Sequence, residues 1–147
     1  MAAGKFTVLN VAMTKQLDGT IMPGTTGFKL ALCTATQAFT AAWTGASGEG
    51  LYSDITNEVT GTGYTAGGID VDVTMAQASG VVTISADPAV WSGVTITAKY
   101  GFLYKDDGDG DVWGFMDLET TEPAGRVVTA SDLTILWPNG LLTAQRD

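Results

Sequence analysis

The sequence predicts a mainly β fold, an antiparallel β-sandwich or partly open barrel of about seven or eight strands with at most one or two short helices. Three observations predict it. Glycine is frequent, with 19 residues in a chain of 147, and marks many turns. Lysine and arginine together number only 7, whereas threonine, valine and aromatic residues, which suit pleated strands, are abundant. Several short segments alternate between apolar and polar residues, and the length is that of one β-domain over residues 1–147.

The clearest alternation follows a polar segment in residues 52–75. The polar part ends in several glycines, and a short helical turn with Ser53 as its cap is predicted near its start. Residues 69–75 then alternate strictly, which predicts a half-buried strand. The apolar face of that strand would be Ile69, Val71, Val73 and Met75.

Six further segments have strand patterns, and turns separate them. They are residues 28–34, 82–86, 94–105, 112–118, 127–137 (in two parts) and 141–144. Residues 94–105 form the longest predicted strand. Residues 112–118 are apolar on both faces, which predicts one face in the core and the other against a neighbouring subunit.

Residues 1–20 are a possible N-terminal arm or short helix. Apolar residues recur at helical spacing in residues 6–17, from Phe6 and Leu9 onwards, and favour a helix. The β-branched residues of the same stretch leave a strand as the competing interpretation. An exposed apolar helix here would act as an anchor.

The loop at residues 35–50 carries two isolated aromatic residues, Phe39 and Trp43. One interpretation is that their rings fix the loop to the core. The other is that they contact a partner, because isolated aromatic side chains are typical anchors of protein interfaces.

Charge and cysteine content exclude several classes of partner. The net charge of −9 argues against binding to nucleic acid or to anionic membranes, which need a basic face. No apolar run approaches the roughly 20 residues of a membrane span. The one cysteine, Cys33, allows no internal disulfide and is expected to be buried and inert. Without a signal-peptide pattern, we expect the protein to be made and assembled in a cytoplasm.

The sequence offers little that indicates catalysis, a cofactor or a metal. The absence of histidine excludes the Ser-His and Cys-His mechanisms. The acidic residues 106–111 fail the calcium-loop pattern, because Val112 and Leu118 stand where glycine and glutamate are required. Residues 61–66 match a dinucleotide-binding pattern by letter, but a strand follows where a helix is needed. We therefore expect no enzyme activity, no cofactor and no metal, and explain residues 106–111 as a charged hairpin tip.

Three stretches resemble a family of small virion proteins of tailed bacteriophages, described as structural, head-decoration or minor tail proteins. They are SDITNEVTGTGYTAGG from Ser53, FKLALCT upstream, and a downstream strand that reads W…TITAKYGFLY. The resemblance covers roughly residues 6–104, and the family has no catalytic motif to carry over. It implies a non-enzymatic structural role in the virion.

The resemblance, with the acidic composition, favours a capsid decoration or cement protein on the head surface. The implied partners are the major capsid protein and copies of the chain itself, as a homotrimer or other symmetric oligomer. A tail tube, terminator or tip protein is the alternative. A glycan-binding module that uses exposed tryptophans is a third hypothesis. The candidate contact residues are Phe6, Leu9, Phe39, Trp43, Tyr52 and Tyr64.

Overall fold

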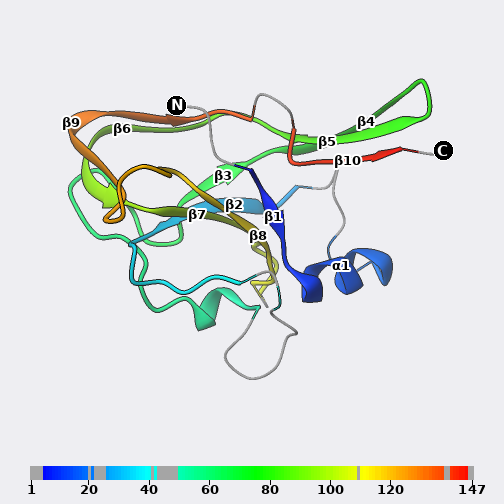
Figure 1. Cartoon of the computed structure of the whole chain (residues 1–147), viewed down its shortest axis with the longest axis horizontal. Coiled ribbons are helices and arrows are strands. Elements are labelled where there is room, and N and C mark those ends of the chain that lie inside the picture. Colours follow the sequence, from blue (N-terminus) through cyan, green and yellow to red (C-terminus); the bar gives the residue numbers. More distant parts are fainter. Residues whose placement is uncertain are drawn as a thin grey trace.

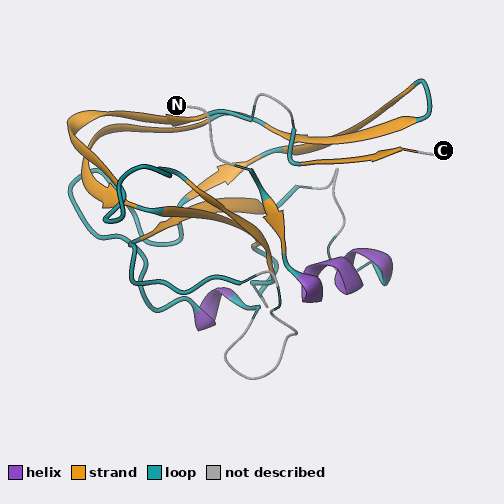
Figure 2. Ribbon diagram, in the orientation of Figure 1, coloured by secondary structure: helices purple, strands orange, loops and turns teal. Residues whose placement is uncertain are grey.

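The computed structural model describes residues 5–19, 21, 26–40, 42, 50–108, 110–137 and 140–145. This part of the chain is mainly β, with antiparallel sheets stacked in two layers and no closed barrel (Figure 1). The helical elements lie on one side of the sheets (Figure 2). The predicted fold class is therefore confirmed.

The strands follow one another along the chain with two helical elements among them. The strands are β1 (Thr7–Val8), β2 (Phe28–Cys33), β3 (Ile69–Val71), β4 (Val73–Ala78), β5 (Val81–Ala86), β6 (Ala89–Ala98), β7 (Tyr100–Lys105), β8 (Val112–Asp117), β9 (Arg126–Ile135) and β10 (Leu142–Gln145). The helical elements are the α-helix α1 (Asn10–Leu17) and the 3-10 turn η1 (Tyr52–Asp54).

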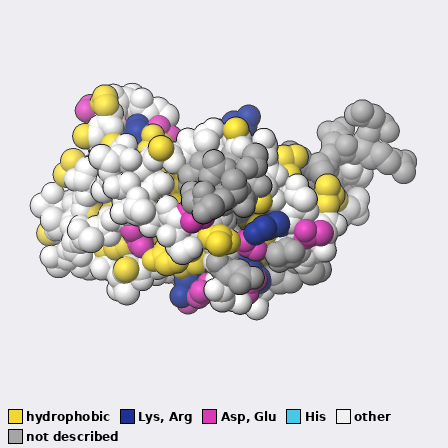
Figure 3. Space-filling model, turned by 90° about the horizontal axis from the view of Figure 1, so that it is seen from below, with side chains coloured by type: hydrophobic (Ala, Val, Ile, Leu, Met, Phe, Trp, Pro, Cys, Tyr) yellow, Lys and Arg dark blue, Asp and Glu magenta, His cyan; other side chains and the backbone are white. Residues whose placement is uncertain are grey.

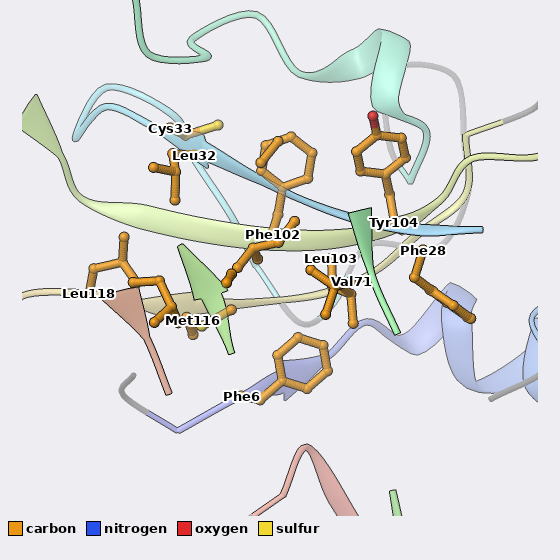
Figure 4. Packing of buried hydrophobic residues seen from close by; sticks show 14 of the residues in the cluster. Phe6, Phe28, Leu32, Cys33, Val71, Phe102, Leu103, Tyr104, Met116 and Leu118 are labelled. Carbon is orange, nitrogen blue, oxygen red and sulfur yellow. The ribbon is translucent and has the colours of Figure 1, made fainter. Parts of the chain in front are cut away.

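The larger sheet has the strand order β1–β8–β7–β2–β3. Strand β7 pairs with β2 along its whole length, from Tyr100 opposite Cys33 to Lys105 opposite Phe28. Successive residues of β7 point to opposite faces of the sheet, as the pleat requires. Figure 4 shows Phe102 and Tyr104 directed toward the loop that contains η1, and Leu103 directed to the other side. Both faces of this sheet are therefore covered, which explains why β2 and β7 are apolar on both faces.

The second layer contains the pair β6–β9 and the smaller sheet β10–β5–β4. Figure 1 shows β6 and β9 stacked over the larger sheet and continuing toward β5, β4 and β10. Val94 and Ile135 are fully buried in this layer. Burying a large aliphatic side chain contributes about 1.5–3 kcal/mol, so these contacts hold the two layers together.

Two predicted strands are each divided between the layers. Residues 94–105 belong to β6 and β7, with a break at Lys99, and residues 69–75 belong to β3 and β4, with a break at Asp72. The single long strand predicted at 94–105 is therefore wrong. Conversely, the two parts predicted within residues 127–137 form one strand, β9.

Strand β8 is buried on both faces by the chain itself. Trp113 packs against Phe6 and Phe28, with ring centroids 5.5 and 5.6 Å away. Phe115 instead stacks on Phe39, with centroids 4.9 Å apart. In a regular strand, residues two positions apart such as Trp113 and Phe115 would share one face. The register shift in the β7–β8 pairing explains why their rings have different neighbours. The prediction that a neighbouring subunit covers one face of β8 is not needed to explain its apolar residues.

The N-terminal segment combines both of its predicted structures. The β-branched pair Thr7–Val8 forms β1 and pairs with β8, and α1 begins two residues later. Lys15 of α1 forms an ion pair with Asp111, whose side chain is buried. This pair holds the helix against the start of β8.

Candidate functional site

The polar segment at residues 50–68 lies across the larger sheet and is held there by Glu58. Both carboxylate oxygens of Glu58 accept hydrogen bonds. Oε1 accepts from the Tyr64 hydroxyl at 2.6 Å and from the Gly67 backbone N–H at 2.7 Å, and Oε2 accepts from the Tyr52 hydroxyl at 2.7 Å. Hydrogen bonds to a charged acceptor are stronger than those between neutral groups. Glu58 therefore acts as the central acceptor of the segment.

Tyrosines connect this segment to the strands beneath it. The Tyr64 hydroxyl also accepts the backbone N–H of Leu32, at 3.0 Å, and the Tyr104 hydroxyl donates to the Gly67 carbonyl, at 2.9 Å. The Tyr52 ring stacks on the Tyr104 ring with centroids 4.7 Å apart. The tyrosine hydroxyls and rings of the segment are thus occupied by internal contacts.

The turn that begins this segment differs in one detail from the prediction. A single helical turn is present as η1, but Ser53 is not its cap. Leu51 precedes the turn, and its N–H donates to Oδ2 of Asp54 at 2.9 Å.

Three tyrosines and one cysteine in and beneath the segment are held in their neutral forms. Burial, with the nearby carboxylates, raises the pKa of Tyr104 to about 12. Burial and the hydrogen bond to Glu58 raise the pKa values of Tyr52 and Tyr64 further. Burial also raises the pKa of the Cys33 thiol, which is fully buried. A thiol kept neutral is a poor nucleophile, so the expectation that Cys33 is buried is confirmed and its environment is that of an inert thiol.

These shifts make the fold sensitive to alkaline pH. An unfolded tyrosine titrates near 10, and the folded pKa values are higher. The stability that depends on neutral phenols is therefore complete below pH 10, and is lost as the pH rises through about 12.

We expect the free energy of unfolding, measured with urea, to fall steadily above pH 10. In Tyr104→Phe the fall should be shallower, although this variant is less stable at neutral pH. Parallel curves for the two proteins would contradict the assignment.

The candidate contact residues at the N-terminus lie in the core. Phe6 is 8% exposed and Leu9 is fully buried. Phe6 is also oriented edge-on to Trp137, with ring centroids 6.2 Å apart. The N-terminal segment is therefore not an exposed apolar arm at these two positions, and they offer no surface to a partner. The reason is that β1 pairs with β8 at the edge of the larger sheet and brings the flanking Phe6 and Leu9 into the core.

The remaining aromatic candidates do not form a shared surface. Phe39, Tyr52 and Tyr64 are half-buried, and their rings contact rings of the chain itself. Phe39 fixes its loop to Phe115, which corresponds to the first of the two interpretations of that loop. Trp43 lies outside the described residues.

Two of the acidic residues at 106–111, Asp106 and Asp111, are paired with lysines. Asp106 lies 2.8 Å from Lys29, and Asp111 is the buried partner of Lys15. Asp109 is not among the described residues. In the part of the chain that is described, no three histidine, cysteine, aspartate or glutamate side chains are grouped so that they could hold a metal ion. On the face seen in Figure 3, basic side chains are scattered, and most lie beside acidic ones.

The strand predicted at residues 94–105 contains a buried lysine, Lys99, that the sequence analysis did not single out. Lys99 is 7% exposed and lies in the break between β6 and β7. Its Nζ donates to the backbone carbonyls of Glu119 and Glu122 and forms an ion pair with Asp117 at 3.0 Å. Lys99 therefore holds the loop that connects β8 to β9. Its position in an otherwise regular alternation gave no signal of this role.

Among the described residues, large exposed apolar side chains are few, and none of them belongs to the polar segment at residues 50–68. On α1 they are Met13 and Leu17, which is 92% exposed; on the strands they are Met75, Val90 and Val127; and Leu136 follows β9. Met13 and Leu17 are four residues apart and so lie on one side of the helix. None of the helices in the described ranges is long and apolar enough to cross a membrane.

Comparison of the chain with protein-family models, with curated proteins and with solved structures finds no match.

Proposed function

We propose that this chain is a non-enzymatic structural protein of a tailed-bacteriophage virion, and that it decorates or cements the capsid from its outer surface. The proposal rests on the resemblance of residues 53–68 and their flanking strands. One observation supports it most: Glu58, Tyr64 and Gly67 of that stretch bond to one another and to the sheet. A segment used in this way serves as part of the body, as a structural protein requires.

The mechanism would be interfacial. Each copy would contact the major capsid protein and add a modest buried area at the joint between subunits. Many copies in a symmetric array would together resist the outward pressure of the packaged genome, since linked weak contacts reinforce one another. The acidic charge of the chain, −9, keeps it from adhering to that genome.

The test is the location and copy number of the protein in purified virions. Heads and tails are separated, and the chain is quantified in each by mass spectrometry. Hundreds of copies on heads would support the decoration role. Copies on tails alone would replace it with the tail component, and absence from both would overturn a virion role altogether.

The apolar pair on α1 is the surface to change first. We expect Leu17→Lys to weaken binding of the purified protein to heads that lack it by about tenfold or more, because a buried leucine contributes about 1.5–3 kcal/mol. Since Leu17 is almost fully exposed, the variant should keep the thermal stability of the parent. Val127→Lys is the matched control, because it makes a similar change at an exposed position on β9. Equal binding by all three proteins would exclude α1 as the contact.

A further inference from the structure

The hairpin of β4 and β5 extends away from the body of the protein. Val73 at its base is buried, whereas every residue from Thr74 to Gly80 is exposed. Figure 1 shows the tip of this hairpin projecting away from the larger sheet, with β10 beside it. Both faces of β4 are thus in solvent, although a small isolated sheet of this kind is only marginally stable in water.

This projecting sheet is uncharged. Residues 73–86 contain no aspartate, glutamate, lysine or arginine, although the chain as a whole carries a net charge of −9. Asp72 and Asp87 stand immediately outside this stretch. Met75 is 58% exposed, where the alternation of the sequence predicted a buried residue. An uncharged strand with an exposed apolar side chain is typical of a surface that a partner covers.

The other open strand edges have features that discourage pairing. Strands β1, β3 and β10 are edges of only two, three and four residues. Strands β6 and β9 are longer, but their pairing has an irregular register, and β9 also has a positive φ of 45° at Ala130 and charges at Arg126 and Asp132. Short length, bulges and charges are the usual protection of an edge strand. Strand β4, with six residues at the end of its sheet, has none of these.

The hairpin turn decides which backbone groups face the open edge. Ser79 and Gly80 both have positive φ, 50° and 80°, as in a two-residue turn of the primed type. Such a turn makes Ala78 and Val81 a hydrogen-bonded pair, and these pairs alternate along the strands. The N–H and C=O groups of Met75 and Gln77 therefore point away from β5.

We propose that β4 pairs with β4 of a second copy of this chain, antiparallel and around a two-fold axis at Ala76. In this register Met75 of each copy lies opposite Gln77 of the other and exchanges the backbone hydrogen bonds that both leave open. The two three-stranded sheets become one six-stranded sheet. We favour a second copy as the partner of β4. Each copy has a net negative charge, and pairing through the uncharged hairpins keeps the charged parts of the two copies apart, so that their repulsion is small. This inference is independent of the proposed function.

The mass of the purified chain in a dilution series tests the pairing. We expect sedimentation to give twice the 15.2 kDa of one chain at high concentration. Ala76→Lys places like charges opposite each other at the axis and should leave a monomer with unchanged circular dichroism. Val127→Lys, with the same charge change on β9, should remain a dimer. A monomeric parent, a trimer, or a dimer that Val127→Lys abolishes and Ala76→Lys does not would each overturn the proposal.

A cysteine at the axis gives a second, independent measurement. Directly opposed residues of a non-hydrogen-bonded pair approach closely enough for a disulfide. We expect Ala76→Cys to form a covalent dimer on mild oxidation, while Val127→Cys does not. The native Cys33 is buried and adds no background to the folded protein. Failure of Ala76→Cys to cross-link under conditions in which the parent is dimeric would exclude this register.

Discussion

Replacing Gly68 by alanine is expected to lower the free energy of unfolding by about 3 kcal/mol or more. Gly68 has a φ of +73°, which side chains of L-residues rarely adopt. A Cβ atom there would lie 1.9 Å from the carbonyl oxygen of Leu30 and 2.7 Å from Cα of Ala31. Both obstacles are backbone atoms of β2, which is paired on both sides, with β7 and β3, so neither moves aside without disturbing the sheet.

Gly80→Ala is the matched control for this prediction. Gly80 has a similar φ of +80°, but no atom lies within 4 Å of the position that its Cβ would take. This variant should therefore lose only the cost of the backbone conformation, about 1–2 kcal/mol. Urea unfolding of both variants and the parent measures the difference. If both variants lost the same free energy of unfolding, the backbone at Gly68 would be able to move away from β2, and its close approach to that strand would not be required.

The strands were predictable from the sequence because alternation is a local property, whereas their distribution between layers was not. In residues 94–105 the apolar residues keep the same phase before and after Lys99. The chain nevertheless leaves one sheet there and enters another. The decision depends on distant partners, since Lys99 binds carbonyls about 20 residues further along the chain. No window of the sequence contains both sides of that interaction.

The candidate site shows the same limit more sharply. Phe39 was a candidate for a partner contact because nothing near it in the sequence explains an exposed ring. Its partner, Phe115, is 76 positions further along the chain, and the two rings stack. Likewise Tyr104 and Gly67 are joined across 37 positions. Composition indicates that aromatic side chains are present, but only the fold decides whether they contact the chain itself or another molecule.

Replacing Glu58 by alanine is expected to lower the free energy of unfolding by about 3 kcal/mol. The substitution removes the acceptor of the two tyrosine hydroxyls and of the Gly67 N–H. Because these groups are partly buried, water replaces the carboxylate incompletely, and each unsatisfied donor adds its own cost. Urea unfolding at neutral pH measures the loss. Glu122→Ala is the control, because that residue is exposed and its described contacts with Lys99 and Gly125 use its backbone carbonyl.

A double-mutant cycle with Tyr52→Phe separates the hydrogen bond from the packing of the ring. The phenylalanine keeps the stack on Tyr104 and removes only the hydroxyl that donates to Glu58. We expect a coupling energy of about 1–2 kcal/mol between the two positions. Additive effects would mean that Glu58 does not hold Tyr52.

If Glu58→Ala retained full stability and yet lost binding to heads, the segment would be a contact surface and not an internal support. Stability and binding therefore have to be measured on the same variant, because only their comparison distinguishes a residue that builds the body from one that meets the partner.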